Sequence, residues 1–203
     1  FAIHAAKHYG CHITTTTISA RQHQYAAEKI AEHNLQSQIT LLDRDYRELE
    51  GQYDKLVSIE MIEAVGHQYL NTFFEVCQSL LKPGGKMLIQ AITMNDAHYK
   101  KALKNVDFIK KYIFPGGFLP SISAMMQAVA SRTSLQLNHL EDIGLHYAQT
   151  LADWRERFND QQNAVKTLGY PESFNRLWNF YLCYCEGGFR EKDIGTVQML
   201  FES

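Results

Sequence analysis

The stretch YDKLVSIEMIEAVGHQYLNTFFEVCQSLLKPGGKMLIQAIT (53–93) contains two β-type segments separated by a helical one. YDKLVSIEMI (53–62) and KMLIQAIT (86–93) are short and rich in aliphatic residues, which is typical of buried strands. Apolar residues recur at helical spacing over 68–81, and the PGG turn (83–85) is expected to end that helix. A strand, a helix and a second strand in this order predict a βαβ crossover with parallel strands.

The segments upstream of residue 53 repeat this alternation. CHITTTTIS (11–19) is rich in β-branched residues and ITLLD (39–43) is short and apolar, so both are expected to be strands. A helix is predicted over 20–34, with Ser19 as its N-cap. Strands that alternate with helices predict an α/β fold whose sheet is mostly parallel.

The segments after residue 93 are richer in helix. The elements expected there are a helical stretch, a strand with a loop, two helices and a final strand, over 96–134, 135–147, 149–167, 171–188 and 194–203. FPGGFLPS (114–121) interrupts the first of them with two prolines and two glycines. No linker or repeat divides the 203 residues, so we expect one domain over 1–203 with a helical insertion over about 96–190, before the last strand.

Composition and charge exclude several classes of protein. Hydrophobic residues make up 45% and charged residues 21% of the chain, as in ordered globular domains. The 20 Lys and Arg nearly balance the 22 Asp and Glu, so binding to nucleic acid through bulk charge is not expected. No apolar run reaches the roughly 18 residues of a membrane-spanning helix. The cysteines form no CxxC pair, which disfavours a zinc ribbon, and they suit a reducing cytosol; they are Cys11, Cys77, Cys183 and Cys185.

Candidate ligand-binding residues follow three of the predicted strands. They are Thr17, Ile18, Ser19 and Gln22 after the first, Asp43, Asp45 and Tyr46 after the second, and Glu60 and Glu63 after the third. Parallel α/β sheets bind ligands at the carboxyl ends of their strands, where an acid accepts hydrogen bonds from a ribose or an adenine amino group. Alternatively, these acids cap helices or face water. No glycine-rich phosphate-binding or dinucleotide-binding loop is present to decide between the two interpretations.

Two pairs of residues have both a functional and a structural interpretation. Glu63, near His67, suits the orientation of a small anion or a proton acceptor in a dry pocket, or else the cap of a helix. His4 and His8 are four residues apart, as metal ligands on a helix are, but no third ligand accompanies them. We therefore expect no metal site.

The aromatic residues over 174–184 also admit two interpretations. Their spacing suits a helix that packs into the core, or one that lines an apolar tunnel. Cys183 and Cys185 lie on the same helix and are expected to be buried thiols that fill apolar space.

Six segments together resemble the cyclopropane-fatty-acyl-phospholipid synthases, which are similar to the mycolic acid cyclopropane synthases. They are YGCHITTTTISARQHQYA (9–26), DYRELEGQYDKLVSIEMIEAVGHQYL (45–70), FFEVCQSLLKPGGKMLIQAIT (73–93), DFIKKYIFPGGFLPSI (107–122), HYAQTLADWRERF (146–158) and FNRLWNFYLCYCEGGFR (174–190). IEAVGH (62–67) and YIFPGGFLPS (112–121) are the most specific of these motifs. The resemblance covers nearly the whole chain.

This resemblance implies a fold and an activity. The fold is that of class I S-adenosylmethionine-dependent methyltransferases, a Rossmann-like, doubly wound α/β sheet. The activity is the transfer of a methylene from S-adenosylmethionine to a cis double bond of a phospholipid acyl chain, which forms a cyclopropane ring, with bicarbonate as the base. The implied location is the cytoplasm, with peripheral membrane association, and the implied partners are phospholipid acyl chains at the membrane surface and a second copy in a homodimer.

The resemblance also assigns roles to individual residues. Those matched to the cofactor S-adenosylmethionine are Thr17, Ile18, Gln22, Asp45 and Tyr46, and those matched to a bicarbonate ion are Glu63, Gln90, Ile92 and Tyr147. Gln90 stands where many members of the family have His. Because an amide donates a hydrogen bond to an anion but carries no proton charge, we expect the dependence on pH to differ at this position.

The resemblance places further structure before Phe1. The chain enters a helical pattern at its first residue, so we expect the first strand, its glycine-rich loop and the N-terminal domain of bacterial synthases to lie upstream. The isolated 203-residue chain is accordingly expected to bind S-adenosylmethionine poorly and to be inactive. Two alternatives stay open: a related lipid or small-molecule methyltransferase of the same fold, and a non-catalytic lipid-binding module.

Overall fold

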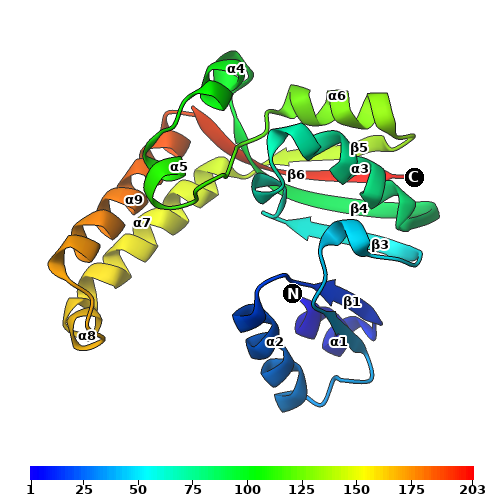
Figure 1. Ribbon diagram of the computed structural model, residues 1–203, viewed down its shortest axis with the longest axis horizontal. Helices are drawn as coiled ribbons and strands as arrows, with labels where there is room; N and C mark the ends of the chain where they lie inside the picture. Colours follow the sequence, from blue (N-terminus) through cyan, green and yellow to red (C-terminus); the bar gives the residue numbers. More distant parts are fainter. The chain divides into compact units, whose positions relative to one another are not determined.

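The computed structural model describes residues 1–203 and divides into two compact units, Phe1–Gly51 and Gln52–Ser203. Each unit contains its own sheet (Figure 1). None of the helices combines the length and the apolar character that crossing a bilayer requires.

The first unit is built around two parallel strands. Its elements are α1 (Ala2–Tyr9), β1 (Ile13–Thr16), α2 (Ala20–Glu32), β2 (Ile39–Leu42) and the 3₁₀ helix η1 (Tyr46–Glu48). Ile13 pairs with Ile39 in register, which confirms both predicted strands, although the first is shorter than predicted. The Ser19 side chain accepts a hydrogen bond from the Gln22 backbone N–H and caps α2, as predicted.

The second unit contains a four-stranded sheet in the order β3-β4-β6-β5. Its strands are β3 (Tyr53–Ile59), β4 (Leu81–Met94), β5 (Gln136–Asp142) and β6 (Ile194–Glu202). β3 and β4 are parallel, which confirms the predicted crossover, and its helix is α3 (Leu70–Ser79). β6 runs antiparallel to both β4 and β5, so it is the reversed strand of the sheet.

One face of this sheet forms the main core of the second unit. Residues of β4 alternate between buried and partly exposed, and Met87, Ile89 and Ala91 lie on the buried side. α3 and α6 (Ile122–Arg132) cover that face (Figure 1). The rings of Phe74 in α3 and Phe201 in β6 meet edge to face, with centroids 6.2 Å apart, and both are fully buried.

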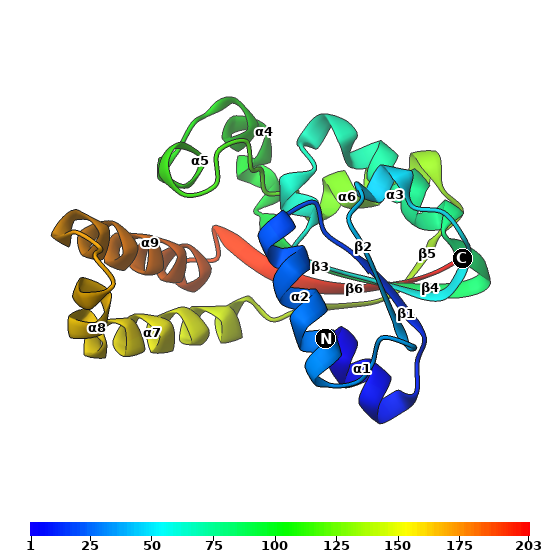
Figure 2. The ribbon, with the colours of Figure 1, turned by 60° about the horizontal axis from the view of Figure 1, so that its bottom comes forward.

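Helices α7 (Gly144–Asp160) and α9 (Glu172–Arg190) pack side by side and extend beyond the sheet, with α8 (Gln162–Thr167) at the tip between them (Figure 2). The single helix predicted over 149–167 is therefore wrong in detail. α7 ends at Asp160 and a new helix starts one residue beyond Gln161.

The remaining elements lie between these strands and helices. They are η2 (Ile62–Ala64), η3 (His67–Tyr69), α4 (Asp96–Lys104) and α5 (Phe108–Tyr112). The helical stretch predicted over 96–134 is thus three helices, and the FPGGFLPS segment separates α5 from α6.

The PGG turn lies inside β4, although the sequence suggested that it separates a helix from a strand. α3 already ends at Ser79, and the extended chain starts at Leu81. Gly84 N–H donates to the Ser203 carbonyl at 3.0 Å, and Ser203 N–H donates to the Gly85 carbonyl at 2.9 Å. The end of β6 therefore holds the turn in the sheet, a long-range effect that local turn chemistry does not reveal.

Candidate functional site

Glu60 lies directly after β3 and changes the direction of the chain there. Its φ angle is 51°, in the left-handed region that residues other than glycine seldom adopt. Its backbone N–H donates to the Gln90 carbonyl at 2.9 Å, which ties the turn to β4. The strand predicted over 53–62 therefore ends at Ile59. The side chain of Glu60 no longer follows the strand pattern, in which successive side chains point to opposite faces of the sheet.

The Glu60 carboxylate is held by two donors from distant parts of the second unit. The β4–β6 register pairs Gln90 with Gln198, and Gln198 Nε2 donates to Gln90 Oε1 at 2.9 Å. Gln90 Nε2 in turn donates to Glu60 Oε1 at 2.9 Å. The Tyr147 hydroxyl of α7 donates to Glu60 Oε2 at 3.0 Å. Each oxygen of the carboxylate therefore has a donor of its own, and hydrogen bonds to an ionised acceptor are strong.

Glu63 lies three residues further along, in η2, and the two oxygens of its carboxyl group have unlike surroundings. The Ile92 backbone N–H donates to Glu63 Oε1 at 2.6 Å, whereas the buried Oε2 atom has no hydrogen-bond partner. Burial, with a smaller contribution from the charge of Glu60, raises the pKa of the Glu63 carboxyl to about 7, despite the opposing effect of the backbone N–H groups of Glu63 and Ile92. Glu63 is therefore poised to exchange a proton near neutral pH.

Tyr147 is fixed by aromatic neighbours. Its ring stacks on Phe189 of α9 with centroids 4.9 Å apart, and it meets Trp154 edge to face at 6.5 Å. Burial, followed by the charge of Glu60, raises the pKa of the Tyr147 hydroxyl well above its ordinary value. The hydroxyl therefore stays protonated and serves as a hydrogen-bond donor.

An apolar wall borders these polar groups. Ala148, Leu151, Leu182 and Phe189 form a buried cluster between α7 and α9. Partly buried residues that pack against this cluster include Ile92, Tyr147, Trp178, Tyr181, Cys185 and Ile194. Such a wall keeps part of the surrounding water away from the carboxylates and so reduces the screening of their charges.

The FPGGFLPS segment contacts the same site. Phe118 N–H donates to the Glu63 carbonyl at 3.0 Å, and the ring of Phe118 meets His67 edge to face at 6.3 Å. The ring of Phe114 meets Tyr181 at 6.3 Å. The two motifs that the sequence singles out as most specific, 62–67 and 112–121, therefore lie side by side.

The structure brings the four residues matched to bicarbonate into one cluster of the second unit: Glu63 and Ile92 share a hydrogen bond, and Gln90 and Tyr147 share Glu60 as their acceptor. Glu60 stands out in the sequence only as an acid after a strand, and the resemblance assigns it no role. Gln198 has no sequence signal at all, because its place depends on the register of an antiparallel pair.

The five residues matched to the cofactor lie together at one edge of the first unit. Thr17, Ile18 and Gln22 follow β1, whereas Asp45 and Tyr46 follow β2, and the two strands end next to each other. The Thr17 hydroxyl donates to Gln22 Oε1 at 2.9 Å. Ile18 is 75% exposed and presents an apolar surface at this edge.

Asp45 is organised by its neighbour Arg47. Asp45 Oδ1 accepts hydrogen bonds from the backbone N–H and Nε of Arg47, both at 2.9 Å, and Oδ2 accepts one from Nη2 at 2.8 Å. These side-chain and backbone hydrogen bonds lower the pKa of Asp45 to about 2, so it is ionised at neutral pH. An exposed apolar side chain beside a fixed acid and a hydroxyl suits an adenosine group.

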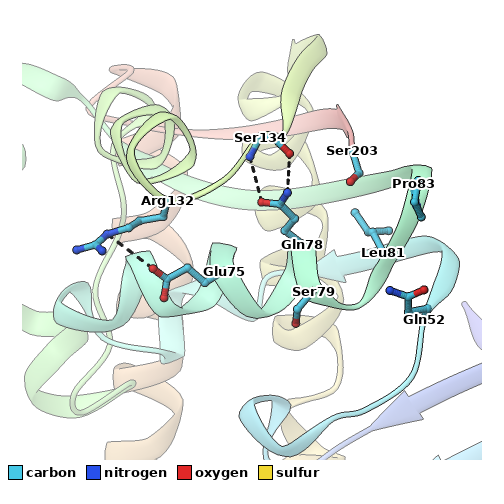
Figure 3. Close-up of a pocket in the computed structure, with 9 residues that line it drawn as sticks. All are labelled: Gln52, Glu75, Gln78, Ser79, Leu81, Pro83, Arg132, Ser134 and Ser203. Carbon is cyan, nitrogen blue, oxygen red and sulfur yellow. Dashed lines mark hydrogen bonds and ion pairs between the residues drawn. The ribbon is translucent and has the colours of Figure 1, made fainter.

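Other candidates lie outside this cluster. An open pocket of about 560 Å³ is lined by residues of α3 and α6, at the amino end of β4 and at the carboxyl end of β6 (Figure 3). Glu60 lies elsewhere, beyond the carboxyl end of β3. The pocket contains an ion pair between Arg132 and Glu75 at 3.7 Å and hydrogen bonds that join Gln78 to Ser134 (Figure 3). These charged and polar groups therefore bind one another across the pocket.

The histidine and cysteine candidates have simple structural surroundings. The rings of His4 and His8 lie 4.4 Å apart, and no group of three or more His, Cys, Asp or Glu side chains in residues 1–203 is arranged to hold a metal ion. Cys185 is partly buried and burial raises its pKa to about 12, in line with a filler of apolar space. Cys183 is exposed, so the expectation of a buried thiol is wrong there, because this residue faces outward on α9.

Comparison with known proteins assigns the chain to a family. The family model described as mycolic acid cyclopropane synthetase matches residues 1–199. A tuberculostearic acid methyltransferase, UfaA1, from Mycobacterium tuberculosis is 40% identical over 189 residues, which are 93% of this chain and 44% of that protein. A cyclopropane-fatty-acyl-phospholipid synthase from Escherichia coli is 36% identical over 201 residues, 98% of this chain and 50% of that protein. The chain thus spans about half the length of these curated relatives.

Solved structures agree on the fold. The cyclopropane synthase MmaA2 from Mycobacterium tuberculosis superimposes with a TM-score of 0.88, over 98% of this chain and 72% of that one, at 23% identity. A mycolic acid cyclopropane synthase, CmaA1, which was solved with SAH and CTAB, superimposes with a TM-score of 0.87, over 99% of this chain and 73% of that one, at 24% identity. These likenesses confirm the predicted class I methyltransferase fold.

Proposed function

Since the chain belongs to the mycolic acid cyclopropane synthetase family, we propose that the protein transfers a methylene from S-adenosylmethionine to a cis double bond of a phospholipid acyl chain, where a cyclopropane ring forms. One observation supports this function above all. Two carboxylates, Glu60 and Glu63, lie beside an apolar wall in a cluster with the donors Gln90 and Tyr147. An acyl chain fits the wall, and a reaction that develops positive charge fits the carboxylates.

The first unit supplies the residues for the cofactor. S-adenosylmethionine, when bound, supplies an electrophilic methyl group. Thr17, Gln22 and Asp45 offer polar groups at the edge of the first sheet, and Ile18 and Tyr46 offer surfaces that an adenine ring can cover. The roles of these five residues rest on their match to the family motif and on their common position in the structure.

The second unit supplies the surroundings for the acyl chain. The FPGGFLPS segment contacts Glu63 through Phe118 and α9 through the rings of Phe114 and Tyr181. Apolar side chains of this kind exclude water from a reacting alkene. An alkene is a weak nucleophile, so the site must align it with the methyl donor at near-attack distance. Transfer of the methyl group leaves a positive charge on the acyl chain, which Glu60 and Glu63 stabilise.

Ring closure requires a proton acceptor. The resemblance assigns that role to bicarbonate held by Glu63, Gln90, Ile92 and Tyr147. The unpartnered Oε2 atom of Glu63 suits the hydroxyl of such an ion. The N–H and O–H donors of the other three residues, however, already bind the protein's own carboxylates, which disfavours a second anion in this arrangement.

The setting of the reaction follows from the substrate class. Phospholipid acyl chains are reached at a membrane surface, so we propose peripheral association with the membrane from the cytoplasm. A homodimer is the proposed assembly. Chemical cross-linking of the full-length protein, with and without phospholipid vesicles, tests the assembly and the association with lipid together.

A fatty acid methyltransferase that stops after methyl transfer is the second candidate. The relative from Mycobacterium tuberculosis with 40% identity is named a tuberculostearic acid methyltransferase, and this name favours a methylated chain without a ring. The two candidates differ only in the fate of the positive charge after methyl transfer.

Mass spectrometry of lipids separates these candidates. Cells that express the full-length protein are expected to contain acyl chains heavier by one CH₂ group and resistant to ozonolysis, since a cyclopropane ring has no alkene to cleave. A gain of CH₂ with cleavage by ozone indicates a methylated chain that kept an alkene, and a gain of CH₄ indicates a saturated methyl branch, which forms only when a separate hydride donor in the cell reduces that alkene. Unchanged acyl chains, in cells where the protein is folded and abundant, would contradict both enzymatic candidates.

A further inference from the structure

We propose that Glu60 is itself the proton acceptor of this site and stands in the place of a bound bicarbonate; this inference rests on the proposed function and names its base. In the step that closes the ring, a C–H bond of the transferred methyl group breaks. Its electron pair forms the new C–C bond to the cationic carbon, and its proton forms an O–H bond with the Glu60 carboxylate. The partly exposed Glu60 then returns the proton to solvent.

The hydrogen bonds of the site support this role first. Two donors that would hold a free anion, Gln90 Nε2 and the Tyr147 hydroxyl, each bind one oxygen of Glu60, at 2.9 and 3.0 Å. The third donor, the Ile92 N–H, binds Glu63. A carboxylate of the chain therefore receives the contacts that an anion from solution would need, and it does so without the cost of binding that anion.

Gln198 fixes the orientation of the Gln90 side-chain amide. Because Gln90 Oε1 accepts a hydrogen bond from Gln198 Nε2, the amide of Gln90 is oriented with Nε2 toward Glu60. An amide held in this orientation can only donate to Glu60. The two hydrogen bonds, from Gln198 to Gln90 and from Gln90 to Glu60, therefore suit an acceptor that is always present at residue 60. A histidine at residue 90 is not needed to bind the Glu60 carboxylate.

The two carboxylates of the site have different environments. Glu60 has a donor on each oxygen and is partly exposed. Glu63 has a buried oxygen without a partner, and burial raises its pKa to about 7. Pairs of acids whose environments diverge in this way divide their roles, and the donor on each oxygen of Glu60 suits the part of the acceptor.

The backbone of Glu60 provides an independent observation. A left-handed φ of 51° is strained for a residue with a Cβ, whereas glycine adopts it freely. A glutamate at this turn therefore carries a strain that glycine would avoid. Strain of this kind persists where the side chain is needed. Here the left-handed turn directs the Glu60 carboxylate away from the strand and toward Gln90 and Tyr147.

The test compares the full-length protein in buffer stripped of carbon dioxide with the same buffer after addition of bicarbonate. We expect the turnover of the unchanged protein to be the same in both. Glu60→Gly, which removes the carboxylate and suits the backbone, is expected to lose about 100-fold in turnover in stripped buffer and to regain most of it with bicarbonate. Glu60→Gln fills the same space without a base, so it is expected to stay inactive in both buffers.

Lys192→Gly is the matched control for the backbone. Lys192 also has a positive φ, 58°, and lies after α9, outside the cluster, so its replacement by glycine repeats the change in backbone freedom alone. We expect its turnover to be unchanged in both buffers.

A binding measurement is independent of turnover. The carbon-13 signal of labelled bicarbonate is expected to broaden with Glu60→Gly and to stay sharp with the unchanged protein. Broadening with the unchanged protein, or turnover of that protein that requires bicarbonate, would overturn the proposal. A complete lack of product from the unchanged protein in both buffers would instead contradict the proposed function, while the binding measurement would still decide whether Glu60 excludes the anion.

Discussion

The two units organise their candidate residues in different ways. In the first unit, the five residues matched to the cofactor follow two adjacent strand ends, and the contacts that orient Asp45 and Thr17 come from residues two and five positions away. In the second unit, the partners of Glu60 lie 30 and 87 residues away in the chain. The first arrangement is local and exposed, and the second is long-range and partly buried. Substitutions should therefore have modest effects in the first unit and large ones in the second.

The largest expected effect concerns stability and pH. The pKa of Glu63 is about 7 in the folded state, against 4.5 for a solvated glutamate, so the folded state binds the proton more tightly. The free energy of unfolding should therefore fall as the pH rises from about 4.5 to about 7, by on the order of 2–3 kcal/mol, and level off above that range. Denaturant titration at a series of pH values measures this decline.

Two variants test whether Glu63 causes this decline in stability. Glu63→Gln has no proton to lose and is expected to flatten the curve between these pH values. Glu141→Gln, at an exposed position of β5, is expected to keep it. A decline that survives in Glu63→Gln would show that another group causes it.

The next effect is on catalysis by the full-length protein. Glu63→Gln keeps an oxygen for the Ile92 N–H but loses the charge and the proton exchange of the carboxyl, so product formation should fall by more than about tenfold. Initial rates at saturating S-adenosylmethionine provide the measurement. Full activity would remove Glu63 from the proposed mechanism.

A smaller loss is expected for Tyr147→Phe. This change removes the donor to Glu60 Oε2 and keeps the stacking on Phe189, so kcat should fall by about fivefold to tenfold, as expected for the loss of one partly exposed hydrogen bond. Its pH–rate profile should also shift, which a purely structural role for the ring would not produce. Tyr9→Phe, at an exposed position of the first unit, is the matched control and should change neither quantity.

The smallest expected effect lies in the first unit. Asp45→Asn weakens the contacts with Arg47 and removes a charge at the proposed adenosine site. Because Arg47 is exposed and Asp45 only half-buried, water screens these charges, so KM for S-adenosylmethionine should rise only by about threefold to tenfold, with kcat unchanged. A large fall in kcat would mean that the local, exposed arrangement is as critical as the long-range one, and the contrast between the two units would be lost.

Much of the fold was predictable because its signals are local. The β-branched residues of 11–19, the aliphatic segments of 53–62 and 86–93, and the Ser19 cap each depend on neighbours within a few positions, and the structure confirms these elements. The division of 149–167 into two helices and the course of the PGG turn within β4 were not predictable, since each depends on packing or pairing with distant residues.

The candidate site was predictable only in part. The resemblance named Glu63, Gln90, Ile92 and Tyr147, and the structure brings them into one cluster, while their functional roles stay predictions. Glu60 was visible as an acid after a strand, but its importance depends on a left-handed backbone angle and on two distant donors.

The order of the residues alone determined the class of fold and the family, because hydrophobic periodicity and short motifs are properties of neighbouring positions. Tertiary structure alone decided which acid Gln90 and Tyr147 bind and that Gln198 orients Gln90. The physical reason is that a hydrogen bond forms wherever strand register and helix packing bring donor and acceptor within about 3 Å, and neither is encoded in any single segment.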